Sequence, residues 1–281
     1  MGPIVIRPAS VQQLEQVLGW AREEGWGPGL EDAAAFHAAD PGGFLVGWLG
    51  TLPIGSISLV RYGEGYAFLG LFIVRPAFRG RGFGKALWQA ALDRAGSRTI
   101  GLDAVPAQVG RYAAAGFVPA YGTTRWSGHL RGLVATRSLV RPVQPDDVTT
   151  IAQYDATAFG APRPDFLAGW LGPTATRQSE AYFEAEAVRG YGSVRRTVAG
   201  WKIGPLFADT AAIAESLLAT LVTPAATDAL AIDIPSPNLA GTSLAERLGF
   251  KPGFETTRMY RGPAPEQPLD RIFGVTTLEL G

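Results

Sequence analysis

Apolar positions along the first half of the chain follow two different periods. Over residues 11–24 they recur at three- and four-residue intervals, which predicts a helix, and Ser10 is a suitable N-cap. Helical patterns also cover residues 83–95 and 107–115. Short apolar or alternating runs bounded by glycine or proline predict strands at residues 4–7, 44–49, 54–61, 66–74, 99–105 and 117–130. Interleaved helices and strands of this kind predict an α+β unit built on one mixed sheet.

The second half of the chain repeats the first. The run Gly116-Phe117-Val118-Pro119 recurs 133 residues later as Gly249-Phe250-Lys251-Pro252, and two further matches keep nearly the same spacing. These are Arg7-Pro8 with Arg141-Pro142 and Leu71-Phe72 with Leu206-Phe207. Matches in the same order at a constant offset indicate duplication of one unit. The sequence therefore predicts two tandem lobes at residues 1–130 and 140–262, a linker at 131–139 and a C-terminal tail at 263–281.

Composition narrows the classes of function. The chain has 281 residues, 47% of them hydrophobic and 18% charged, which is typical of a folded protein of about two domains. Its 25 basic and 25 acidic residues argue against nucleic acid as a partner. Without cysteine and with two histidines, thiol chemistry and a histidine-rich metal site are excluded. No apolar run approaches the ~20 residues of a membrane span, and no signal peptide is recognisable, so we expect a cytoplasmic protein.

A glycine-rich turn between a predicted strand and a predicted helix carries the clearest chemical signal. Residues 79–85 read Arg-Gly-Arg-Gly-Phe-Gly-Lys, and backbone N–H groups in such a turn at a helix start can converge on an anion, phosphate above all. Ala86 after Lys85 excludes a Walker A motif, and the glycine spacing does not match the dinucleotide fingerprint. No protein-kinase motif accompanies the turn.

The spacing Arg79-x-x-Gly82-x-Gly84 resembles the pyrophosphate loop of the GCN5-related N-acetyltransferase (GNAT) family. Further along, Tyr112-Ala-Ala-Ala-Gly116-Phe117 resembles that family's Y-x-x-x-G-F element, and the resemblance covers about residues 4–130. It implies a tandem GNAT-like fold and acetyl-CoA as co-substrate, with no metal. Ile73 and Val74 at the strand end would pair with the pantetheine arm, and the loop would hold the pyrophosphate through Arg79, Gly80, Arg81, Gly82, Phe83, Gly84 and Lys85.

The resemblance also indicates candidate catalytic residues. Tyr112 matches the residue that often protonates the departing CoA sulfur, although an aromatic packed on the buried face of a short helix is the alternative. Many relatives carry a glutamate where this chain has Phe68. Asp103, near the end of its predicted strand, is the first substitute as general base; a carboxylate that caps the following helix is the other interpretation.

The helical region after residue 24 is the expected wall for the acceptor. Trp26 and Phe36 could stack on a substrate and Asp32 could bind an amine, while packing and solvent exposure are the alternatives. Glu31, His37 and Asp40 lie in the same region, where a surface role is the more ordinary expectation for each.

The second unit lacks both chemical elements. Asp209 stands where a pyrophosphate would lie, and Ala245 replaces the tyrosine. The run 254–260, together with 200–207, resembles the C-terminal acetyltransferase-like domain found behind such transferases. We therefore expect catalysis in the N-terminal lobe alone, and a second lobe that covers the acceptor mouth.

These patterns together predict an N-acetyltransferase that moves an acetyl group from acetyl-CoA directly to a primary amine of a small molecule or peptide. The alternative is a CoA-binding sensor or assembly protein without turnover. The sequence specifies neither the acceptor nor the oligomeric state.

Overall fold

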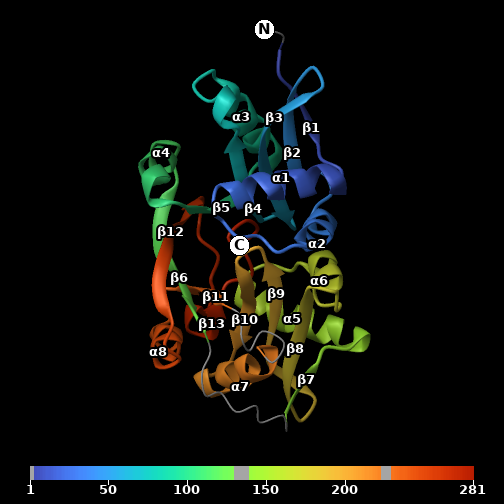
Figure 1. Ribbon diagram of the computed structural model, residues 1–281, viewed down its shortest axis with the longest axis vertical. Coiled ribbons are helices and arrows are strands. Elements are labelled where there is room, and N and C mark those ends of the chain that lie inside the picture. Colours follow the sequence, from blue (N-terminus) through green and yellow to red (C-terminus); the bar gives the residue numbers. More distant parts are fainter. Residues whose placement is uncertain (1–2, 130–138, 223–228) are drawn as a thin grey trace.

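The computed structural model describes residues 3–129, 139–222 and 229–281, and shows two α+β lobes, one above the other in Figure 1. The predicted fold class is confirmed. Most of the predicted linker, at 131–139, lies outside the described residues. The elements of the first unit are β1 (Val5–Pro8), α1 (Val11–Glu23), α2 (Asp32–Ala39), β2 (Phe44–Leu49), β3 (Leu52–Tyr62), β4 (Tyr66–Val74), α3 (Phe83–Ala95), β5 (Thr99–Ala104), α4 (Val109–Ala114) and β6 (Val118–Gly128).

The second unit repeats this order. Its elements are β7 (Val140–Pro142), α5 (Val148–Phe159), α6 (Pro164–Trp170), β8 (Arg177–Glu184), β9 (Ala187–Thr197), β10 (Gly200–Ala208), α7 (Ala211–Leu221), β11 (Leu230–Pro235), α8 (Leu239–Arg247) and β12 (Lys251–Arg261). A short strand, β13 (Ile272–Gly274), follows in the tail, and single 3₁₀ turns precede several elements: η1 (Pro76–Phe78), η2 (Pro106–Gln108), η3 (Pro145–Asp147) and η5 (Leu269–Arg271).

Local sequence accounts for where these helices begin. Ser10 forms a capping box with Gln13 at the start of α1: the Ser10 hydroxyl accepts from the Gln13 N–H, and the Gln13 side chain accepts from the Ser10 N–H. The apolar stripe of α1 is buried, as its period predicts. Helix α3 starts directly after Gly82, whose φ of 82° lies in the left-handed region that glycine tolerates best.

The sequence does not predict one feature of the sheet: the two units exchange their last strands. The sheet runs in the order β1-β2-β3-β4-β5-β12-β6-β11-β10-β9-β8-β7, so β5 pairs with β12 of the second unit and β11 pairs with β6 of the first. Figure 1 shows β6 and β12 side by side along one edge of the molecule, spanning both lobes. Each lobe in space therefore contains one strand from the other sequence unit.

A pair of buried ion pairs marks this exchange. Arg258 on β12 donates to both oxygens of Asp103 on β5, at 2.8 Å each. Arg125 on β6 makes the equivalent pair with Asp233 on β11, at 2.7 and 3.1 Å, and Lys202 lies 2.8 Å from the same aspartate. Each arginine thus lies on an exchanged strand. Each aspartate lies on the strand of the other unit with which that exchanged strand pairs.

The first lobe has an opening in the middle of its sheet. Strands β4 and β5 pair in parallel from Tyr66 and Thr99 to Leu69 and Leu102, and then separate. The register between β3 and β4 shifts between the pairs Ser58–Gly70 and Ser56–Ile73, so that two residues of β4 lie opposite one residue of β3. Leu71 within this bulge has a φ of 45°, rare for a non-glycine residue. The edge of β4 beyond Leu69 is therefore free of its neighbour β5.

The second lobe has the same opening, but a strand fills it. Strands β10 and β11 pair in parallel from Trp201 to Ile203, and beyond that point β10 pairs with β13 at Leu206 and Phe207. The tail then continues toward the first lobe: the Tyr62 hydroxyl donates to the carbonyl of Leu280 at 2.9 Å, and the C-terminal end lies between the lobes in Figure 1.

Candidate active site

The opening in the first lobe leads into a cavity of about 810 Å³. Its wall combines the bulged half of β4, the loop 79–85, the end of β5 and helix α4 with parts of the second unit and the tail. The lining includes Trp26, Ile73, Val74, Arg79, Gly80, Gly82, Phe83, Gly84, Lys85, Asp103, Tyr112, Phe254, Thr256, Leu278 and Glu279. A cavity of this size is typical of a small-molecule or cofactor site.

The loop at residues 79–85 has the geometry of an anion site. Gly80 and Gly82 have φ values of 75° and 82°, and a Cβ on either would meet open space rather than protein. Helix α3 starts immediately afterwards, and its first residues line the cavity, so the positive end of the helix dipole lies at the cavity wall. Lys85 is exposed and also lines the cavity.

The structure brings nearly all the predicted loop and strand residues to this one cavity. Ile73 and Val74 on the free edge of β4 line it together with Arg79, Gly80, Gly82, Phe83, Gly84 and Lys85. The exception is Arg81, which does not line the cavity; its guanidinium lies 5.8 Å from the ring centre of Phe78. The Arg79 side chain donates to the carbonyl of Val74 at 2.8 Å and pairs with Glu24, so it ties the strand end to the end of α1.

Tyr112 lies in the cavity wall on α4. Its ring contacts those of Trp88 and Phe117, with centroids 5.7 and 6.1 Å away. Burial raises the pKa of Tyr112 to about 12, with the charge of Arg111 as a smaller opposing influence. The phenol therefore stays protonated at neutral pH, as a proton donor must.

Asp103 also reaches the cavity wall, but both of its carboxylate oxygens are engaged by Arg258. The pairing is bidentate and fully buried, and Asp103 raises the pKa of the Arg258 guanidinium well above its usual value against the cost of burial. Both oxygens of this carboxylate therefore already accept hydrogen bonds. Asp233 in the second lobe makes the same bidentate contact with Arg125. Asp103 thus joins the exchanged strands, and its role as a general base stays a prediction.

The predicted acceptor residues separate into two groups. Trp26 lines the cavity. Phe36 does not: it is fully buried and stacks on Trp170 of α6, with the ring centroids 6.2 Å apart. Asp32 is also buried outside the cavity, where it accepts from the Gly29 N–H and pairs with Arg195 at 3.2 Å.

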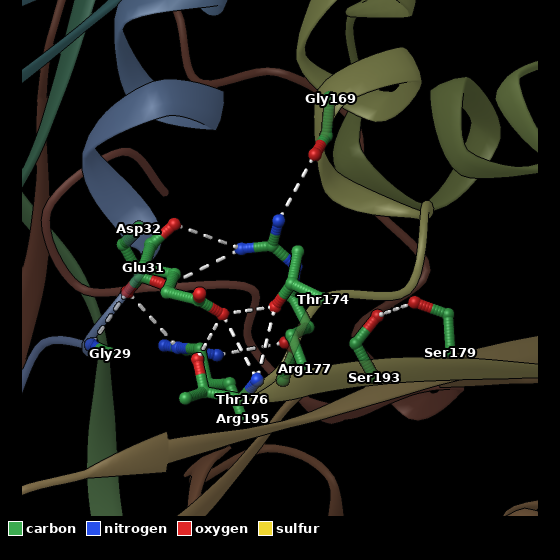
Figure 2. Close-up of polar contacts among 11 residues, drawn as sticks. Gly29, Glu31, Asp32, Gly169, Thr174, Thr176, Arg177, Ser179, Ser193 and Arg195 are labelled. Atoms are coloured by element: carbon green, nitrogen blue, oxygen red, sulfur yellow. Dashed lines mark hydrogen bonds and ion pairs between the residues drawn. The ribbon is translucent and has the colours of Figure 1, made fainter. Parts of the chain in front are cut away.

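Figure 2 shows that Asp32 belongs to a polar contact between the lobes. Arg177 of β8 lies 3.7 Å from Asp32, and Glu31 accepts hydrogen bonds from Thr174 and Thr176 of the second unit. These bonds lower the pKa of Glu31. Asp40 is engaged too, by Arg94 and Arg61, while His37 is half-buried on α2. The region predicted as an acceptor wall is thus mainly an interface between the lobes.

The second unit and the tail contribute four residues to the cavity wall that local motifs do not predict. Phe254 and Thr256 come from the exchanged strand β12, and Leu278 and Glu279 come from the tail. No local motif marks any of them, because their place in the wall follows from pairings between residues more than a hundred positions apart. The one signal in the sequence is the run at residues 271–280, which could extend a sheet.

In the part of the chain that the structure describes, no group of three or more histidine or acidic side chains could hold a metal ion. None of the helices described there is long and apolar enough to cross a membrane.

Comparisons with known proteins agree with this geometry. Residues 11–117 match the Acetyltransferase (GNAT) family and residues 151–274 match the Acetyltransferase (GNAT) domain. Holothin acyltransferase from Pseudoalteromonas sp. (strain SANK 73390) is 32% identical over 277 residues, which cover 98% of this chain and 94% of that protein. These matches identify the chain as an acyltransferase, and it belongs to the GNAT family.

Two solved structures share the fold. A putative acetyltransferase from Pyrococcus horikoshii superposes with a TM-score of 0.84 at 24% identity, covering 100% of this chain and 97% of that one. A tandem GNAT protein from the clavulanic acid biosynthesis pathway superposes with a TM-score of 0.62 at 17% identity, covering 93% and 100%. The tandem architecture of the present chain is therefore one that solved relatives also adopt.

A single and a double substitution can distinguish a structural role of Asp103 from a catalytic one. Asp103→Asn leaves the Arg258 charge buried without its partner, and we expect a loss of about 3–5 kcal/mol in the free energy of unfolding. Adding Arg258→Met removes the stranded charge and should restore most of the stability, measured by denaturant unfolding. The double variant should also keep its acyltransferase turnover. A stable double variant with abolished turnover would show instead that Asp103 is the base.

A matched pair of glycine substitutions tests the loop. Gly82 and Gly63 both have positive φ and open space around the missing Cβ, so alanine at either should cost about 1–2 kcal/mol of stability. Gly82→Ala should also weaken acetyl-CoA binding about tenfold, because the loop amides reorient, whereas Gly63→Ala, in the β3–β4 turn, should leave it unchanged. Titration calorimetry gives both dissociation constants, and equal effects would argue against the loop as the binding site.

Proposed function

We propose that this acyltransferase moves an acetyl group from acetyl-CoA directly to a primary amine, and that the cavity of the first lobe is its one working site. The observation that carries the proposal is the separation of β4 from β5 beside the glycine loop. A pantetheine arm carries amide groups that can pair with a free strand edge, and a pyrophosphate suits converging N–H groups. The family and the Holothin acyltransferase relative support acyl transfer in general.

Acetyl-CoA fits the groups that the chain presents. The edge of β4 from Gly70 to Val74 would align the pantetheine arm, and the amides of residues 79–84 would hold the pyrophosphate. Bound there, acetyl-CoA supplies an activated acyl group as a thioester. Tyr112 in the same wall would donate a proton to the departing sulfur, which its raised pKa permits throughout the neutral range.

Two features support the proposal that the second lobe has no working cofactor site. Strand β13 takes the position beside β10 that a pantetheine arm would need. Asp209 at the end of β10 is already engaged by the Tyr154 hydroxyl at 3.1 Å and by Arg189 and Arg271. Its carboxylate would repel a pyrophosphate.

The acceptor amine can be identified by testing candidate compounds. The name of the relative in Pseudoalteromonas makes holothin the first acceptor to try, followed by small primary amines and amine-bearing peptides. The absence of cysteine from this chain allows release of CoA to be followed directly with a thiol reagent.

Tyr112→Phe separates a transferase from a CoA-binding sensor. Loss of the phenolic proton should lower kcat about a hundredfold, while the dissociation constant for acetyl-CoA stays within about twofold. Tyr182→Phe, at a half-buried tyrosine of the second lobe, is the matched control and should change neither value. If the wild-type protein binds acetyl-CoA but turns over no amine in the panel, the sensor interpretation gains the advantage.

A further inference from the structure

Three basic side chains line the first cavity, and two of them have no partner among the described residues. Arg79 is engaged by Glu24 and by the carbonyl of Val74. Lys85 on α3 and Arg111 on α4 are exposed, and neither makes a hydrogen bond or an ion pair with any residue that the structure describes. These two free cations in the wall of one cavity favour an anionic group of the ligand close to them.

The acidic residues of the same wall do not compensate the free cations. Glu24 pairs with Arg79, and both oxygens of Asp103 accept hydrogen bonds from Arg258. Glu279 is 2% exposed, and its carboxylate interacts with basic side chains of the second unit. The exposed part of the wall that carries the free cations is therefore positively charged.

The free cations lie where α3 and α4 meet. The ring centroids of Trp88 on α3 and Tyr112 on α4 are 5.7 Å apart, so the two helices are neighbours at this point. Lys85 precedes Trp88 by three residues and shares its face of α3, and Arg111 is the neighbour of Tyr112 on α4. Both free cations thus lie beside the glycine loop, on the exposed side of the cavity wall.

Coenzyme A carries one phosphate for which the glycine loop does not account. Its pyrophosphate has the pantetheine arm at one end and an adenosine 3′-phosphate at the other. When the loop amides hold the pyrophosphate and the pantetheine arm follows the free edge of β4 inward, the adenosine extends the opposite way, toward the exposed wall. Arginine binds phosphate through paired N–H donors and lysine binds it as a compact charge, so the free cations suit this group.

We infer that Arg111 and Lys85 bind the adenosine 3′-phosphate of the acyl donor. The donor is then recognised as a free CoA thioester, and not as a phosphopantetheine thioester on a carrier protein, because the carrier-bound arm lacks this phosphate. This inference rests on the proposed function. It adds Arg111, which no motif marks, to the donor site, and it gives Lys85 a phosphate separate from the pyrophosphate.

Acetyl-CoA and acetyl-3′-dephospho-CoA are matched probes, because they differ only in this phosphate. Titration calorimetry of the full-length wild-type protein should give a dissociation constant at least about tenfold lower for acetyl-CoA. Arg111→Gln and Lys85→Gln should each weaken acetyl-CoA binding about threefold or more, and should leave the dissociation constant of the dephospho compound within about twofold. The double variant should bind the two probes almost equally.

Two exposed cations outside the cavity lining provide the controls. Arg7→Gln on β1 and Lys251→Gln on β12 remove the same charges and should keep the wild-type preference for acetyl-CoA. Thermal unfolding of each variant confirms that it is folded. Because the free cations are exposed, added salt should also reduce the preference of the wild-type protein.

The outcomes separate this inference from the proposed function. If the wild type binds acetyl-CoA but shows no preference over the dephospho compound, or if the double variant keeps the preference, the inference is wrong and the proposed function stands. Equal affinity for acetyl-phosphopantetheine and acetyl-CoA would also contradict it and would indicate a carrier-bound donor. If the wild type binds none of the three compounds, the proposed function fails and the inference fails with it.

Discussion

The exchange of strands β6 and β12 is the constraint on which the rest of the molecule depends. Each of the two strands completes the sheet of the other unit, and each brings an arginine to a buried aspartate. Such pairs gain little in net stability over apolar packing, but removing one partner leaves a charge in a low-dielectric interior at high cost. The two units are thereby tied together at their centres, and the wall of the first cavity contains side chains of the second unit.

The two lobes share one architecture and differ at the opening of the sheet. Both sheets open after a short parallel pairing, β4 with β5 and β10 with β11. In the first lobe the opening is left free beside a loop with two glycines in the left-handed region. In the second, β13 satisfies the free edge of β10. The same tail then continues across the lobe boundary to place Glu279 in the first cavity, so one segment accounts for the closed site and for part of the open one.

Much of this could be predicted from local pattern. Strands at 44–49 and 66–74 and the helix at 83–95 have the predicted bounds, because hydrophobic period and glycine or proline boundaries determine them locally. Tyr112 and the loop residues other than Arg81 also line one cavity, as their motifs imply. The strand exchange could not be predicted, since β6 and β12 have nearly the same apolar pattern and either would fit either sheet. The same reason hid Arg258 as the partner of Asp103, the packing of Phe36 on Trp170, and the position of Glu279.

We propose that one of two similar openings binds acetyl-CoA, whereas the chain itself closes the other. Calorimetric titration of the purified full-length protein with acetyl-CoA measures this directly, because the stoichiometry counts sites per chain. The structure predicts one site per chain. Two sites would contradict closure of the second lobe by β13 and Asp209, and no binding would contradict the assignment of the first cavity to acetyl-CoA.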